Sequence, residues 1–132
     1  MKIKFEDHGD GVPLVLLHGF PLSRRMWEPQ KKELVSENVR LILPDLRGFG
    51  ETKSLADINT MEEMAWDVAE LLDDLKIEKA IIGGLSMGGY VTFALFRLKP
   101  DLFSGLVLCD TTSAADTEEK RLQRAAFLAR YL

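Results

Sequence analysis

The stretch AIIGGLSMGGY, residues 80–90, decides the fold of this 132-residue chain. It opens with an apolar run that is typical of a strand buried on both faces of a sheet. Glycines then surround a single serine, Ser86, and the residues Met87–Leu98 predict a helix that Pro100 stops. A strand that passes through a glycine-rich turn directly into a helix is a building unit of α/β proteins.

The rest of the chain alternates strands and helices in the same way. Further strands are predicted at Lys2–Glu6, Pro13–Leu17, Val39–Leu43 and Leu106–Cys109. Further helices are predicted at Ser23–Glu37, after a capping box at Thr60–Glu63, and after a second capping box at Asp116–Glu119. This order predicts an α/β fold with a mainly parallel, twisted sheet flanked by helices on both faces.

The serine turn also carries the strongest indication of chemistry. GLSMG, residues 84–88, matches the G-x-S-x-G turn that presents a nucleophilic serine. Such a turn strains the backbone of the serine and leaves no room for side chains two residues away, where this chain has Gly84 and Gly88. The helix that follows points its first N–H groups at the reacting carbonyl, so the Met87 N–H is a candidate oxyanion donor.

Two alternatives to a nucleophile exist for this turn. By itself the five-residue pattern also fits an ordinary glycine-rich turn, but here the required strand precedes it and the required helix follows it. A phosphate-binding loop is the second alternative. The glycines do not have the G-x-G-x-x-G spacing, and the lysine of a P-loop is absent, so the pattern favours the nucleophile.

A second loop of interest is HGFP, residues 18–21, which follows the predicted strand Pro13–Leu17. A loop that leaves this strand can place another N–H beside the nucleophile, and we assign this second oxyanion donor to Phe20. His18 is a candidate base by residue type. A histidine in a tight loop more often holds the loop by hydrogen bonds, so we expect His18 and Gly19 to support the loop.

Three segments in this order resemble the α/β-hydrolase superfamily, and the resemblance extends over essentially the whole chain. They are VLLHGFPLSRRMW (15–27), LILPDLRGFGET (41–52) and IIGGLSMGGYVTFALFRLKPDLFSGLVLCD (81–110). In that family the first segment carries the oxyanion loop and the third carries the nucleophile turn. The sequences of these segments are most similar to those of small cap-bearing serine esterases and lactonases, including enol-lactonase-like and cofactor-free perhydrolase-like members.

The resemblance implies an enzyme that cleaves a small-molecule carboxylic ester or lactone through an acyl-enzyme on Ser86, without a cofactor. Dehalogenase and epoxide-hydrolase relatives have an aspartate at this position instead. Residues 1–113 would form the N-terminal part of the core, and residues 114–132 would begin a cap. Asp45 and Arg47 lie in the second segment, which in the family braces the loops around the site.

The family's catalytic acid and histidine follow the serine along the sequence. The chain has only the histidines His8 and His18, and both precede Ser86. Asp110, after the predicted strand Leu106–Cys109, is a candidate acid, but it also fits the start of a turn. We therefore interpret the chain as the N-terminal half of a hydrolase, with the first six strands of the family sheet, and inactive alone.

Three explanations for such a half stay open. It is a truncated piece of an ordinary hydrolase, one chain of a split enzyme, or a non-catalytic α/β module that binds a ligand or partner. In each case the strand Leu106–Cys109 would form an exposed sheet edge, and the sheet would be incomplete there. We expect this edge to self-associate or to pair with a C-terminal fragment.

Composition limits the other function classes. A net charge of −4 with finely alternating signs favours neither nucleic acid nor an acidic membrane. The N-terminal residues lack the apolar core of a signal peptide, and no run approaches the length of a membrane span. The single cysteine, Cys109, excludes an internal disulfide and fits a reducing compartment, so we expect a cytoplasmic protein. The pattern predicts no metal site.

Overall fold

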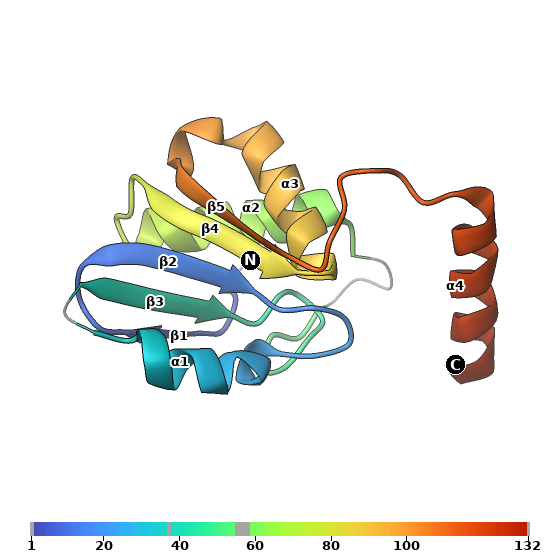
Figure 1. Ribbon diagram of the computed structural model, residues 1–132, viewed down its shortest axis with the longest axis horizontal. Helices are drawn as coiled ribbons and strands as arrows, with labels where there is room; N and C mark the ends of the chain where they lie inside the picture. The colour runs from blue at the N-terminus through green and yellow to red at the C-terminus, as the bar shows by residue number, and fades with distance from the viewer. Residues whose placement is uncertain (1, 37, 55–58, 132) are drawn as a thin grey trace.

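The sheet organises the structure, a computed structural model that describes residues 2–36, 38–54 and 59–131. Its order is β1-β3-β2-β4-β5 (Figure 1). The strands are β1 (Phe5–His8), β2 (Val12–Leu17), β3 (Val39–Pro44), β4 (Ala80–Leu85) and β5 (Phe103–Cys109). Strand β1 runs antiparallel to β3, and every other neighbouring pair is parallel. The mainly parallel α/β fold expected from the sequence is confirmed.

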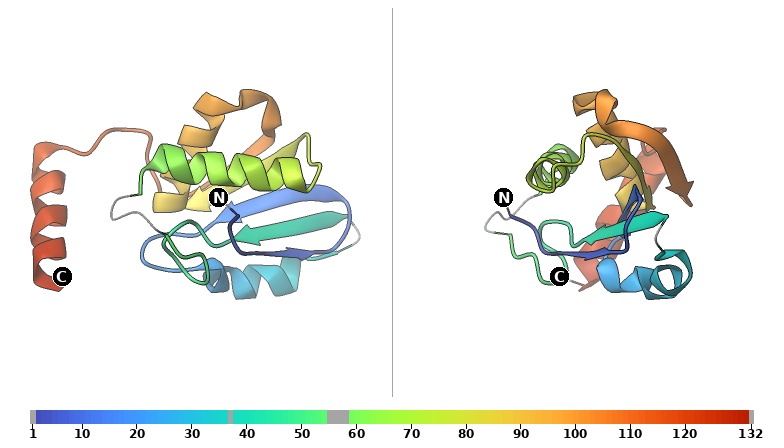
Figure 2. Two further views of the ribbon diagram at one scale, coloured as in Figure 1. Left: turned by 180° about the vertical axis from the view of Figure 1, so that it is seen from behind. Right: turned by 90° about the vertical axis from the view of Figure 1, so that its left-hand side faces the viewer.

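Helices cover both faces of this sheet. Helix α1 (Glu28–Leu34), with the 3-10 turn η1 (Arg24–Trp27) before it, packs on one face. Helices α2 (Met61–Asp74) and α3 (Met87–Leu98) pack on the other, as the end-on view in Figure 2 shows. A short 3-10 turn, η2 (Pro100–Leu102), leads from α3 into β5.

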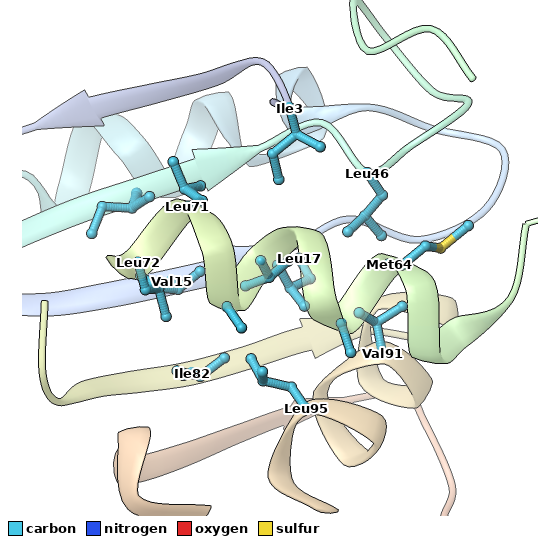
Figure 3. Close-up of a cluster of buried hydrophobic side chains, with 14 of the residues drawn as sticks. Ile3, Val15, Leu17, Leu46, Met64, Leu71, Leu72, Ile82, Val91 and Leu95 are labelled. Carbon is cyan, nitrogen blue, oxygen red and sulfur yellow. The ribbon is translucent and has the colours of Figure 1, made fainter. Parts of the chain in front are cut away.

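The hydrophobic core has a layer on each side of the sheet because successive strand residues point to opposite faces. Val15 and Leu17 of β2 face α2 and α3, whereas Leu16 faces Trp27. Figure 3 shows the larger layer, in which α2 lies across the strands. Its fully buried members include Val15, Leu17, Ile42, Leu46, Val68, Leu72, Ile82, Val91 and Leu95. β2 is therefore buried on both faces, as its continuous apolar run predicts.

The N-terminus of α2 has the capping box expected from the sequence. The Glu63 N–H donates to Thr60 Oγ1 at 3.2 Å, and the Thr60 N–H donates to Glu63 Oε2 at 2.9 Å. This reciprocal pair satisfies N–H groups that the first helical turn leaves without partners. It fixes where α2 begins.

Two helix predictions need correction. The single helix expected at Ser23–Glu37 is the turn η1 followed by the shorter α1, because Pro29 lacks an N–H and fits only the first turn of a helix. The capping box expected at Asp116–Glu119 does not form either. Thr117 Oγ1 accepts the Lys120 N–H at 3.3 Å instead, while Asp116 pairs with Arg124 at 2.8 Å.

Helix α4 (Glu118–Tyr131) stands clear of the sheet and of the other helices in Figure 1. Arg124 links it to α3: its Nη2 donates to the Tyr90 hydroxyl at 3.3 Å, and its guanidinium lies 5.9 Å from the centre of the Tyr90 ring. Leu122 and Phe127 are exposed on α4. None of the helices in the described part of the chain has the length and hydrophobicity that a membrane crossing requires.

The strands differ from expectation mainly at the ends of the sheet. β1 begins at Phe5 rather than Lys2, because Phe5 is the first residue in register with β3. β5 begins at Phe103 rather than Leu106. The described residues contain five strands, not the six that the family resemblance implies. In this part of the chain β5 pairs only with β4, so its other side is an open edge.

Candidate active site

Ser86 lies at the sharp turn between β4 and α3. Its backbone has φ +49° and ψ −109°, a left-handed conformation that costs a non-glycine residue of order 1–3 kcal/mol. A Cβ atom on Gly84 would lie 2.5 Å from the carbonyl carbon of Gly88. A Cβ atom on Gly88 would lie 2.7 Å from the carbonyl carbon of Leu17. The two glycines therefore let the strand, the turn and the helix touch at backbone distance.

The turn leaves the reactive groups of Ser86 available. Its side chain is half-buried, and its hydroxyl makes no hydrogen bond within residues 2–36, 38–54 and 59–131. Met87 is the first residue of α3, so its N–H has no partner inside the helix. This arrangement offers a free hydroxyl beside a free N–H donor at the positive end of a helix dipole.

The HGFP loop lies against this turn. A Cβ atom on Gly19 would lie 3.7 Å from the Ser86 Cβ, so the loop and the serine are direct neighbours. The loop is held by the Leu22 N–H, which donates to the Gly19 carbonyl at 2.9 Å. Phe20 is 52% exposed, and its ring meets the edge of the Phe49 ring at 5.8 Å between centres. Phe20 follows Gly19 in this loop and lies at the surface, and the role of its N–H as a second oxyanion donor stays a prediction.

His18 is fully buried, and both of its ring nitrogens are occupied. Nε2 accepts the Leu46 N–H at 3.0 Å, so this nitrogen carries no proton, and Nδ1 donates to the Gly19 carbonyl at 3.1 Å. Burial lowers the pKa of His18, although the Gly19 carbonyl and Asp45 favour the charged form. A neutral imidazole with both nitrogens bonded holds the loop and has no free nitrogen to act as a base.

The stability of the protein should therefore depend on pH through His18. The folded pKa lies below the unfolded value, so the unfolded state binds more protons between the two. The contribution of His18 to the unfolding free energy is fully present above about pH 6.5, the unperturbed pKa of histidine. It falls as the pH drops towards the folded pKa. Urea unfolding from pH 8 to pH 5 should show this loss in the wild type, and a His18→Leu variant should lack that part of the slope.

At pH 8 the same variant should lose roughly 2 kcal/mol, because the buried Leu46 N–H has no partner. The matched control is His8→Gln, since His8 lies at the sheet edge with 40% of its side chain exposed. It should change the unfolding free energy by less than about 0.5 kcal/mol at pH 8. An unaltered slope in His18→Leu would contradict the assigned role of His18.

Asp45 holds the loops around the site together. It is fully buried, and its carboxylate accepts the Arg24 N–H and the Glu51 N–H, each at 2.8 Å. The Arg24 guanidinium also binds Asp45, and it reaches Glu51 at 2.9 Å and Glu6 at 3.2 Å. One buried carboxylate thus joins the segment after β3 to the segment after the HGFP loop.

Arg47 binds that same segment to α2. Its guanidinium makes a bidentate pair with the buried Asp67 at 2.6 and 2.8 Å and reaches Glu63 at 3.0 Å. The hydrogen bonds to Asp67 raise the pKa of Arg47. Both Asp45 and Arg47 therefore hold loops in place, which is the structural role expected from the family resemblance.

Asp110 follows β5 directly and has φ +42°, a left-handed conformation. Its side chain is exposed. The residues on either side of it bind the backbone of Ser86: the Ser86 N–H donates to the Cys109 carbonyl at 3.0 Å, and Thr111 Oγ1 donates to the Ser86 carbonyl at 2.9 Å. The structure therefore places Asp110 next to Ser86, at a point where the chain turns back on itself.

His8 is not part of this arrangement. It lies on β1, which β3 and β2 separate from β4, and its Nε2 binds Glu6 at 2.9 Å. In the described ranges, no group of histidine, cysteine and acidic side chains is arranged to hold a metal ion. Sequence reasoning missed the roles of Arg24, which begins the turn η1, and of Thr111, which follows β5, because neither residue belongs to a recognised motif.

The fold agrees with comparisons to known proteins. The family model described as the alpha/beta hydrolase fold matches residues 12–132. The chain belongs to the α/β-hydrolase family. Within it, this α/β hydrolase spans about half the length, or less, of the relatives that it matches.

A thermophilic esterase from Thermogutta terrifontis has 47% sequence identity to this α/β hydrolase and a TM-score of 0.89, covering 97% of this chain and 47% of the esterase. The AB hydrolase superfamily protein YisY of Bacillus subtilis is 41% identical over 65% of this chain and 32% of its own length. Epoxide hydrolase 3 of Siraitia grosvenorii is 35% identical over 81% of this chain and 34% of its own length. Other relatives are non-heme haloperoxidases, and other similar structures are esterases and an N-acyl homoserine lactone degrading enzyme.

Proposed function

We propose that this α/β hydrolase is the nucleophile-bearing part of a serine hydrolase that cleaves a small-molecule carboxylic ester or lactone. The observation that carries the proposal is the strained Ser86 at the turn between β4 and α3, with an unbonded hydroxyl and the Gly19 loop against it. A left-handed serine between two glycines that exclude side chains is costly to fold, and such strain is typical of functional sites.

In the proposed reaction the Ser86 Oγ attacks the acyl carbonyl while its proton passes to a base. The N–H groups of Phe20 and Met87 bind the oxygen as it becomes negative. The bond to the leaving oxygen then breaks, and that oxygen takes the proton from the base. Water attacks the resulting ester, again giving a proton to the base, and Ser86 regains its proton as the acid leaves.

The base would come from outside the described residues. His18 is committed to the loop, and His8 lies on the far edge of the sheet. Asp110 would act as the acid only through a histidine that serves as this external base, so its assignment stays a proposal. Without the base, the oxyanion donors and binding alone would support a small residual rate.

We place the missing part at the open edge of β5. Leu106 and Leu108 are 50% and 45% exposed on this strand, so an apolar face lies beside an unpaired backbone. A further strand from a C-terminal segment, or from a second copy of the chain, would cover both. Helix α4 would begin a cap over the site. The protein would be cytoplasmic, because a single cysteine, Cys109, fits a reducing compartment.

The residue at the turn separates this proposal from the other chemistries of the family. Epoxide-opening and dehalogenating members would need an aspartate where this chain has Ser86. The thermophilic esterase with 47% identity supports acyl chemistry, while lactone cleavage and peracid formation would use the same serine and donors. A split enzyme is the second candidate, because the described part of the chain holds no base free to serve Ser86.

A serine-directed fluorophosphonate probe tests the proposal. The gene product as encoded should be labelled at Ser86, as peptide mass spectrometry would show, and should hydrolyse p-nitrophenyl esters of short acids. Ser86→Ala should abolish both. The 132-residue chain alone should be labelled at least about 100-fold more slowly, because the base contributes that much or more.

The outcomes separate the candidates. Fast labelling of the 132-residue chain alone would contradict the assignment of an external base. Labelling that appears only when a separately made C-terminal polypeptide is added would support the split enzyme. A gene product that is never labelled yet binds esters would rule out the hydrolase in favour of a binding module.

A further inference from the structure

We propose that Thr111 is a positioning residue for the oxyanion donor Met87, an inference that rests on the proposed hydrolase function. The Thr111 hydroxyl donates to the Ser86 carbonyl at 2.9 Å. That carbonyl and the Met87 N–H belong to one planar, trans peptide unit, in which the two groups point in opposite directions. Fixing the carbonyl oxygen therefore fixes the direction in which the Met87 N–H points.

The position of Thr111 is itself held by the first turn of α3. A Cβ atom on Gly89 would lie 2.6 Å from the Thr111 Cβ, so the threonine side chain sits directly on the helix backbone. Gly89 is thus required for a reason unrelated to the serine motif. Because Asp110 has φ +42°, the chain turns back after β5 and brings Thr111 onto the turn.

The segment from Cys109 to Thr111 holds Ser86 from both ends. The Ser86 N–H donates to the Cys109 carbonyl at 3.0 Å, and the Ser86 carbonyl accepts the Thr111 hydroxyl. The N–H groups of Gly89 and Tyr90 reach the same carbonyl at 3.0 and 3.3 Å from within α3. Unlike these two donors, Thr111 lies outside α3. Its hydrogen bond therefore connects the strained turn to the end of β5, and it polarises the peptide that carries the Met87 N–H.

Two substitutions separate the hydroxyl of Thr111 from its packing. Thr111→Val keeps the contact with Gly89 and removes the donor, whereas Thr111→Ser keeps the donor. In the gene product as encoded, Thr111→Val should lower kcat for p-nitrophenyl ester hydrolysis roughly 10-fold at unchanged KM, since a small misplacement of a catalytic group has effects of this size. Thr111→Ser should restore kcat. Thr112→Val is the control, because among the described residues the Thr112 hydroxyl accepts only the exposed Ala114 N–H, at 3.1 Å.

A second measurement does not depend on activity. Amide hydrogen exchange of Ser86 should be faster in Thr111→Val than in the wild type, and unchanged in Thr111→Ser and Thr112→Val. If the wild-type protein is inactive and exchange is still faster in Thr111→Val, the positioning role stands and only the proposed function is contradicted. Unchanged exchange in Thr111→Val, or an unchanged kcat in an active enzyme, would overturn the role of Thr111.

Discussion

A Gly88→Ala variant should lose roughly 3 kcal/mol of unfolding free energy, at the upper end for overpacking of a core. Alanine has a higher helix propensity than glycine by about 1 kcal/mol, so propensity alone predicts a more stable α3. The contacts oppose this. The new Cβ would lie 2.7 Å from the Leu17 carbonyl carbon and 2.8 Å from the His18 carbonyl oxygen. Both are backbone atoms at the end of a central strand, and neither can move without disturbing the sheet.

Gly105→Ala is the matched control for this prediction. Gly105 lies on β5, where the nearest atom to a new Cβ would be Ile81 Cγ1 at 3.2 Å. A side-chain methyl can yield by a few tenths of an ångström, and alanine loses less entropy than glycine on folding. The change should stay within about 1 kcal/mol. Equal losses in the two variants, measured by urea unfolding, would refute the steric account of the turn.

The architecture was predictable because local patterns determine it. The run Pro13–Leu17 is apolar throughout since β2 is buried on both faces, and the spacing in α2 marks a single buried side. The G-x-S-x-G pattern predicts a sharp turn from a strand into a helix, and the structure has this turn between β4 and α3. Each of these signals lies within a few residues of the feature that it predicts.

Features that depend on distant contacts could not be predicted in this way. The cap of α4 moved to Thr117 because Asp116 pairs with Arg124, eight residues further on. Thr111 meets Ser86 across 25 positions, and Arg24 meets Asp45 across 21. No pattern in the sequence indicates which loop residue will find such a partner, so the supporting contacts of the site became visible only in the structure.

The largest electrostatic effect should come from Asp45→Asn. The carboxylate is fully buried and accepts two backbone N–H groups and the Arg24 guanidinium, which is 11% exposed. The asparagine amide replaces one acceptor oxygen with an NH2 donor, which would face the N–H groups that bind Asp45. The substitution also leaves the Arg24 charge largely desolvated and without its partner. Breaking a buried pair from one side typically costs 3–5 kcal/mol, so we expect a loss of about 3 kcal/mol or more in urea unfolding.

A pair on the sheet edge separates burial from charge. Asp7 makes a bidentate pair with Arg40 at 3.0 and 2.7 Å, with more than a quarter of each side chain exposed. Water solvates either partner of this pair when the other is removed, so Asp7→Asn should cost less than about 1 kcal/mol. If the two variants lost equal stability, burial would not explain the contribution of Asp45 to the unfolding free energy. The loops that carry Phe20 and Phe49 would then need another anchor beside Ser86.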